Sequence, residues 1–188
     1  RGPGRPFFDA VARRVPDLAL LAEDLGGVTP GVHELRRYAG IPGMRVMQFA
    51  FGAGADNAFL PHNYARETAA YLGTHDNDTT ARWWSLLDAP VRAHAAEYLG
   101  IPASSPPREA VVRMIGALSA SVADTVIFTV QDLTGAGERI NTPGVTEGSW
   151  RYAAGEEVLD ADAAALLLRV TRLYGRSAAK TAENEGVR

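Results

Sequence analysis

The sequence predicts a parallel α/β fold, and three features of the chain lead to that class. Four apolar runs are typical of buried strands, at residues 18–22, 44–51, 69–73 and 125–130. Helical segments lie between and around these runs, and such alternation of strands and helices indicates a parallel sheet. Polar side chains follow every run, at the carboxyl ends of the strands, where parallel α/β proteins carry their binding and catalytic groups.

Two helices are expected within the first forty residues. One covers residues 7–14, ahead of the first apolar run. The second begins at Thr29-Pro30 and runs to Tyr38, because threonine is a good N-cap and proline is favoured at the first helical position. Together they place one helix on each side of the first predicted strand.

The remaining helices are expected in the second half of the chain. Three of them cover residues 78–87, 90–99 and 107–121. Asp160 is expected to cap a last helix over residues 161–174, because aspartate is a strong N-cap. The apolar residues of this helix fall on one stripe, which consists of Leu166, Val170 and Leu173.

The composition excludes several classes of function. The 188 residues carry 19 Lys and Arg against 22 Asp and Glu, a net charge of −3, so we expect no nucleic-acid partner. No apolar run reaches the ~18 residues that would cross a bilayer, so no membrane partner is expected. The chain has no cysteine, which removes disulfides, thiolate zinc sites and a cysteine nucleophile and fits a reducing, cytoplasmic location.

Glu23 and Asp24 follow the first apolar run directly. A carboxylate at the rim of an apolar strand loses part of its hydration, which suits it to general-acid catalysis. The alternative is a structural role, in which both carboxylates cap the next helix or pair with an arginine. From the spacing alone the structural role is favoured.

Residues 74–79 form the densest polar cluster of the chain. A metal site there is disfavoured, because a calcium loop that starts at Asp76 would need glycine and glutamate where Ala81 and Leu87 stand. A zinc site is disfavoured as well, since the four histidines lie far apart in the sequence. We therefore expect no metal.

Two other interpretations of this cluster remain. In the first, His75 and Asp76 bind vicinal hydroxyls of a sugar, and the neighbouring Trp83-Trp84 pair supplies apolar surface. In the second, Asp78 caps a helix and the tryptophans belong to the core. For the tryptophans the second interpretation is favoured, because large aromatic side chains are mostly buried for packing.

The other polar loops are less informative. Residues 60–64 (LPHNY) fit a ligand-binding loop and a turn held by Asn63 equally well. A second loop covers residues 139–144, and Gly148-Ser149-Trp150-Arg151 follows it. The chain contains neither a G-x-x-x-x-G-K-[ST] nor a G-x-G-x-x-G phosphate loop, and it has no G-x-S-x-G nucleophile elbow.

Seven segments of the chain together resemble the 4-α-glucanotransferase family, which includes amylomaltase and disproportionating enzyme. In the order of the family they are AEDLG at 22–26, VTP at 28–30, GIPGMRVMQFAF at 40–51, LPHNY at 60–64, GTHDNDTT at 73–80, QDL at 131–133 and NTPG at 141–144. The resemblance spans residues 17–152. We therefore expect residues 1–188 to be part of one glycoside-hydrolase-type catalytic domain.

The resemblance implies a fold and an activity. The fold is a (β/α)₈ TIM barrel, and four strands where a barrel has eight indicate its C-terminal half, about strands 5–8, without the N-terminal half. The activity is transfer of segments of α-1,4-glucans and maltooligosaccharides to the 4-hydroxyl of an acceptor sugar. The family retains the anomeric configuration by double displacement. The resemblance implies no cofactor.

The resemblance also assigns roles to individual residues. The family's general acid/base corresponds to Glu23, and its carboxylate that stabilises the oxocarbenium-like transition state corresponds to Asp76. His75 is implied to bind the same sugar, Phe49 to line the donor site, and Asn141 to contact sugar from the later loop.

The chain departs from the family at the nucleophile. The family's nucleophile is an aspartate in an R-x-D-H motif, and this motif does not occur in the 188 residues. The opening residues 1–6 resemble neither a signal peptide nor the start of a domain, so we expect a piece of a longer chain that is inactive alone. Two alternatives remain: an α-glucan hydrolase of the same mechanism, and a non-catalytic glucan-binding or structural half.

Overall fold

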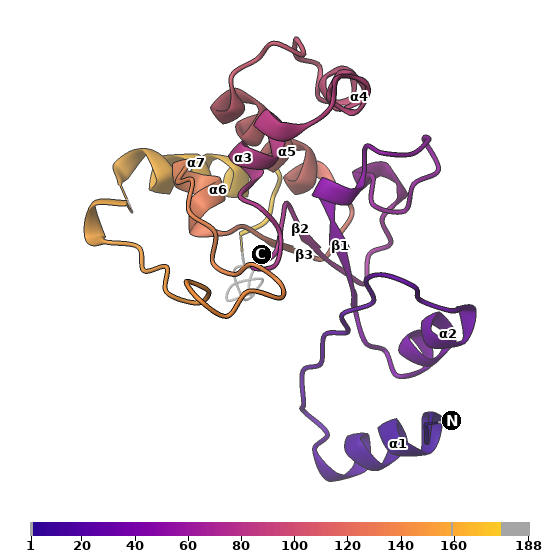
Figure 1. The fold of residues 1–188 in the computed structure, drawn as a ribbon. Coiled ribbons are helices and arrows are strands. Elements are labelled where there is room, and N and C mark those ends of the chain that lie inside the picture. The colour runs from indigo at the N-terminus through magenta and orange to yellow at the C-terminus, as the bar shows by residue number, and fades with distance from the viewer. Residues whose placement is uncertain (1, 159, 178–188) are drawn as a thin grey trace, which may run out of the picture.

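The computed structural model describes residues 2–158 and 160–177, and its strands form one parallel sheet in the order β1–β2–β3 (Figure 1). The strands are β1 (Gly43–Val46), β2 (Thr68–Tyr71) and β3 (Thr125–Ile127). Gly43 pairs with Thr68 at the start of the ladder, and Tyr71 pairs with Ile127 at its end. The predicted parallel α/β class is therefore confirmed, while the predicted domain extent of 1–188 runs beyond the described residues.

The first predicted strand, residues 18–22, is wrong as a strand. Only Ala22 joins the sheet, through an isolated parallel bridge to Gly43. Its N–H donates to the carbonyl of Pro42 at 2.9 Å, and Pro42 itself has no N–H with which to extend a ladder backwards. The preceding Leu18, Leu20 and Leu21 are exposed. Apolar composition predicted burial here, but the neighbouring backbone is not arranged to pair.

The other strand predictions are correct in place and too long. The second predicted strand, 44–51, ends at Val46, and Met47–Phe49 continue as a 3-10 helix. The fourth, 125–130, ends at Ile127 because Thr129 caps a short helix, α6 (Val130–Thr134). β3 is also the outer strand of the sheet, and its first and third residues are exposed rather than covered on both faces.

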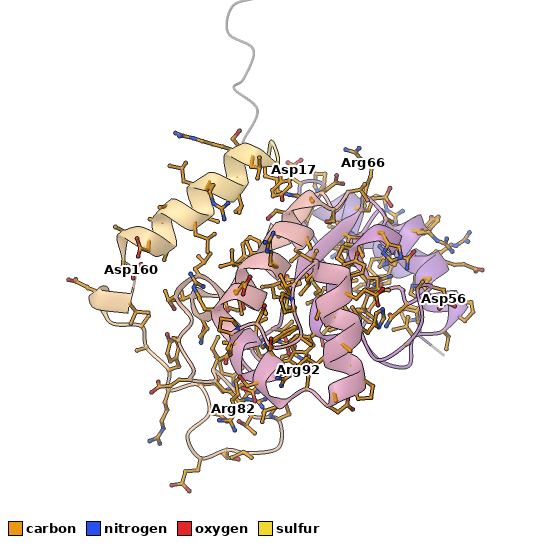
Figure 2. All side chains as sticks on the ribbon, turned by 90° about the horizontal axis from the view of Figure 1, so that it is seen from above. Asp17, Asp56, Arg66, Arg82, Arg92 and Asp160 are labelled. Carbon is orange, nitrogen blue, oxygen red and sulfur yellow. The ribbon has the colours of Figure 1, made fainter. Side chains whose placement is uncertain are left out.

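The predicted helices are all present. They are α1 (Arg5–Arg14), α2 (Pro30–Tyr38), α3 (Thr80–Leu86), α4 (Ala89–Leu99), α5 (Pro107–Ala120) and α7 (Ala161–Leu173). Asp160 caps α7 as predicted, accepting a bond from Ala163 N at 2.8 Å (Figure 2). The predicted cap of α3, Asp78, is wrong, because Thr79 occupies the N-cap position and accepts from Arg82 N.

The apolar core lies among the sheet, α3, α4, α5 and α7. Its largest fully buried members include Trp84, Met47, Leu60, Leu72, Met114, Ile115 and Leu118. The indole N–H of Trp84 donates to Ser105 O at 3.1 Å, and Trp83 packs against the same core, so the prediction that both tryptophans are core residues is confirmed. In the predicted stripe of α7, Leu166 and Val170 are buried, whereas Leu173 is exposed.

The first two helices lie apart from this core. In Figure 1, α1 and α2 lie below and to the right of the strands, whereas α3 to α7 lie above them. Neither α1 nor α2 contains a buried residue. They touch each other through Tyr38, whose hydroxyl donates to Asp9 at 2.7 Å. No helix within the described residues is both long enough and apolar enough to cross a membrane.

Candidate active site

Three of the predicted site residues meet above the carboxyl end of β2. Asn141 Nδ2 donates to Asp76 Oδ1 at 2.5 Å, and His75 Nε2 lies 3.3 Å from the same oxygen. The backbone N–H of Asn141 donates to His75 O at 3.2 Å. Residues 65 positions apart thus converge on one carboxylate, which is about half exposed and open to a ligand.

The loop that carries Asp76 is held from within. The side chain of Asn77 turns back, and its Oδ1 accepts bonds from both the backbone N–H and the hydroxyl of Thr74, each at 2.9 Å. The same hydroxyl accepts from Asp76 N at 3.3 Å. These local bonds explain why a polar run of six residues folds into one defined turn after a buried strand.

Arg139 ties the later loop to this turn. Its Nη2 donates to Asp76 O at 2.8 Å, and its Nε donates to Asn141 O at 3.1 Å. Its Nη1 also lies 3.9 Å from the carboxylate of Asp78, which pairs more closely with Arg82, at 3.0 Å. The sequence indicates this loop but not the role of Arg139, because a contact between distant loops leaves no periodic signal.

A buried polar network supports the site from below. Gln48 Nε2 donates to Asp78 O at 3.0 Å and lies 3.3 Å from the Thr80 hydroxyl. Thr80 Oγ1 donates to Asp132 Oδ1 at 2.6 Å, and Asp132 Oδ2 accepts from Thr129 N at 2.9 Å. The network links the residues that follow β1, β2 and β3, and so it joins the carboxyl ends of all three strands.

Asp132 is the charged centre of that network. It is almost fully buried, and burial raises the pKa of its carboxyl above the ordinary value of 3.8. The bonds from Thr80 and Thr129 lower the pKa again and offset part of this effect. Gly73 makes room for the network, since a Cβ there would lie 2.5 Å from Gln48 Nε2.

Glu23 and Asp24, the two carboxylates that follow the first apolar run, lie in different environments. Asp24 is buried: its Oδ1 accepts from Met44 N at 2.7 Å, and its Oδ2 lies 3.4 Å from both Arg36 and Arg45 and 3.8 Å from His33. The structural alternative therefore holds for Asp24. Glu23, by contrast, is exposed.

Phe49 lies just past the end of β1 and is 45% exposed. Its ring meets that of Phe59 edge to face, with 5.5 Å between centroids. The structure therefore joins His75, Asp76 and Asn141 by direct contacts. No hydrogen bond or ion pair within the described residues links Glu23 or Phe49 to them.

The loop at residues 60–64 is a structural turn. The ring nitrogens of His62 contact Tyr98 Oη at 3.1 Å and Ala55 O at 2.9 Å. Asn63 Nδ2 donates to Ala55 O and Asn57 O. These side chains close the preceding loop, so the turn held by Asn63 is present. Within residues 2–158 and 160–177, no group of three or more His, Asp or Glu side chains is arranged to hold a metal ion.

Comparison with known proteins gives a consistent picture at the sequence level. A family profile described as 4-alpha-glucanotransferase matches residues 1–156. The chain is 44% identical over 153 residues to the chloroplastic/amyloplastic 4-alpha-glucanotransferase of Arabidopsis thaliana, covering 80% of this chain and 26% of that protein. It is 35% identical over 179 residues to the 4-alpha-glucanotransferase of Clostridium butyricum, covering 94% and 36%. The chain thus spans about a quarter to a third of the length of these relatives.

Solved structures agree with the sequence comparison. The amylomaltase of Streptococcus agalactiae, solved in complex with acarbose, superposes with a TM-score of 0.87 at 30% identity, covering 94% of this chain and 36% of that one. The amylomaltase of Corynebacterium glutamicum shares the fold, with a TM-score of 0.60. It is 19% identical, and the match covers 89% of this chain and 29% of that one. The first neighbour implies a TIM-barrel-type fold. The chain belongs to the 4-alpha-glucanotransferase family.

Proposed function

We propose that the protein carrying this chain transfers segments of α-1,4-glucans and maltooligosaccharides to the 4-hydroxyl of an acceptor sugar. The observation that carries this proposal is the convergence of His75, Asp76 and Asn141 at the end of β2, in a chain that belongs to this family. The cluster offers one carboxylate, one imidazole and one amide to neighbouring hydroxyls. The binding of acarbose by the Streptococcus agalactiae amylomaltase supports a sugar ligand.

In this proposal Glu23 and Asp76 supply part of the chemistry, and the nucleophile that bonds to the sugar as the leaving oxygen departs comes from outside residues 1–188. Glu23 protonates the leaving oxygen and later activates the acceptor hydroxyl, and its exposure beside the buried Asp24 supports this role. Asp76 stabilises the oxocarbenium-like transition state through hydrogen bonds. His75 and Asn141 orient the Asp76 carboxylate and bind the same sugar. Phe49 lines the donor site with its exposed face.

The substitution Glu23→Gln tests the acid/base assignment in the intact enzyme. Turnover of natural glucans should fall by about 10²–10⁴, the contribution of a positioned acid. An α-glucosyl fluoride donor should be affected much less in its first step, because fluoride needs little protonation to leave. The comparison variant is Glu67→Gln, since Glu67 is exposed at the opposite end of β2. Wild-type rates with both donors would contradict the assignment.

We also propose that the chain supplies about strands 5–8 of a (β/α)₈ barrel and that residues 1–188 alone do not turn over glucans. The parallel order of β1, β2 and β3, with Ala22 bridged beside β1, supports the barrel assignment. The absence of an R-x-D-H motif from the 188 residues supports the lack of activity. Asp24 does not replace the nucleophile, because its carboxylate is engaged by two arginines.

Complementation separates this proposal from its alternatives. Residues 1–188 should not disproportionate maltotriose alone, and activity should appear when they are coexpressed with the part of the Clostridium butyricum relative that they do not match. Release of glucose without redistribution of chain lengths would indicate a hydrolase of the same mechanism. Disproportionation by residues 1–188 alone would contradict the need for a supplied nucleophile.

A further inference from the structure

Trp150 adopts a backbone conformation that tryptophan rarely takes. Its φ is 61°, and among the residues that the structure describes no other non-glycine residue has a positive φ. A left-handed conformation is strained for a bulky side chain. Such strain persists where surrounding contacts hold the residue in place, and it gathers at sites that bind ligands.

The loop around Trp150 supplies those contacts. The N–H of Trp150 donates to Ile140 O at 2.7 Å. The hydroxyl of the preceding Ser149 donates to Val145 O at 2.7 Å and accepts from Thr142 N at 3.3 Å. The start of the loop is fixed to Asp76 by Arg139 and Asn141, as described above. Trp150 is therefore held at a defined position beside the candidate active site.

The indole ring of Trp150 lies outside the apolar core of the described residues. It is 65% exposed, whereas Trp84 in the core is 1% exposed. Its recorded ring contact is with His75, at 4.9 Å between centroids and 39° between planes. His75 in turn lies 3.3 Å from Asp76 Oδ1. An apolar plane thus stands next to a row of hydrogen-bonding side chains.

This combination fits a sugar. A pyranose ring carries C–H groups on its faces and hydroxyls around its edge, so an aromatic plane flanked by donors and acceptors recognises it. We propose that Trp150 is a sugar-stacking residue, whose indole binds the glucose unit next to the one that His75, Asp76 and Asn141 hold. The inference rests on the proposed function and names a binding residue that the family resemblance did not supply.

Fluorescence of residues 1–188 tests the contact directly. Trp150 is the most exposed of the three tryptophans, so acrylamide should quench it most strongly. Maltoheptaose should protect the chain from this quenching, and cellohexaose, with β-1,4 linkages, should not. In the Trp150→Phe variant the protection should disappear, because Trp83 and Trp84 pack in the core. Equal protection in that variant would overturn the proposal.

Two substitutions separate stacking from a structural role. Trp150→Gly removes the ring and tolerates φ of 61° without strain, so Tm should not fall, while calorimetric affinity for maltoheptaose should drop by about tenfold. Trp150→Phe keeps an aromatic plane, and its affinity should stay within about threefold of the unaltered chain. Unchanged affinity in Trp150→Gly, or a drop of several degrees in its Tm, would overturn the proposal.

The same titrations show whether the stacking role of Trp150 alone fails or glucan binding by the chain fails as well. If the unaltered chain binds maltoheptaose and Trp150 stays fully open to acrylamide, only the stacking role is wrong. If the unaltered chain, melting cooperatively, shows no heat of binding at any maltoheptaose concentration, residues 1–188 do not hold a glucan by themselves, and the stacking role falls.

Discussion

Residues 2–42 bury few side chains, whereas residues 43–134 bury many. In the first region only Ile41 and the charged Asp24 are buried, and α1 and α2 bury nothing. In the second region α3, α4 and α5 each bury two or more residues, around an apolar core that includes Trp84, Leu72 and Ile115. The first region is thus joined to the sheet by an ion cluster and one bridge, and the second by packing.

The difference shows what an apolar run needs in order to become a strand. Residues 18–22 and β2 are both apolar, but β2 has a paired strand on each side and buries three of its four residues. Leu20 and Leu21 belong to no strand, and they stay exposed. Pairing within the sheet and packing against the core, rather than apolar content alone, decide which run is buried.

The largest effect is expected from Asp24→Ala, which breaks the link between the two regions. Removing the carboxylate leaves Arg36 and Arg45 facing one another near an empty site, and loss of one partner of a buried ion pair destabilises by about 3–5 kcal/mol. Urea unfolding measures the loss, and hydrogen exchange at Ala22 N–H reports whether the bridge opens. Asp17→Ala, at an exposed aspartate nearby, is the control (Figure 2). Equal stability of both variants would contradict the claim that the ion cluster at Asp24 joins the two regions.

A smaller loss of stability should distinguish the buried Leu72 from the exposed Leu20. Leu72→Ala should lower the free energy of unfolding by about 2–5 kcal/mol, because it leaves a cavity in a closed core. Leu20→Ala, at a 39% exposed side chain, should change it by no more than about 0.5 kcal/mol. Thermal and urea unfolding of the two variants measures the contrast. A loss at Leu20 as large as that at Leu72 would show that the first region is packed in solution.

Much of the fold could be predicted because it depends on local pattern. The helix starts at Pro30 and after Asp160 follow from caps and proline, and the burial of Trp84 follows from its size and neighbours. The strand at 18–22 and the cap at Asp78 could not be predicted correctly. The first depends on which backbone lies alongside, and the second on Asp78 being drawn to Arg82 instead.

The site was predictable only where residues adjoin or resemble a family motif. His75 and Asp76 stand side by side in the sequence, and Asn141 was assigned to the site by resemblance. The network under them joins Gln48 to Thr80 across 32 positions and Thr80 to Asp132 across 52. No periodicity or spacing rule relates such residues, since the fold alone brings them together.

A further loss of stability is expected when that network is broken at Thr80. Thr80→Val keeps the shape of the side chain and removes the hydroxyl that donates to Asp132, so it should destabilise by about 1.5–3 kcal/mol, as for a lost bond to a charged group. Thr80→Ser keeps the hydroxyl and should retain most of the stability. Urea unfolding gives both values. Equal losses in the two variants would show that the methyl group, and not the hydrogen bond, matters.

The smallest effect is a pH dependence centred on Asp132. Burial raises its pKa in the folded state above the ordinary value of 3.8. A raised carboxyl pKa means that the folded state holds its proton more tightly than the unfolded state. The resulting stabilisation is complete below pH 3.8 and is lost as the pH rises through the folded-state pKa.

Asp132→Asn removes this titration and so reveals its sign. The stability of the unaltered chain relative to this variant should decline as the pH rises from below 3.8 to neutral, whatever the offset caused by the lost acceptor. Asp56→Asn, at an exposed aspartate, controls for the removal of a charge (Figure 2). Urea unfolding at a series of pH values measures both differences. A relative stability that rises with pH would mean that the bonds from Thr80 and Thr129 outweigh burial, and Asp132 would then stabilise the network as a carboxylate.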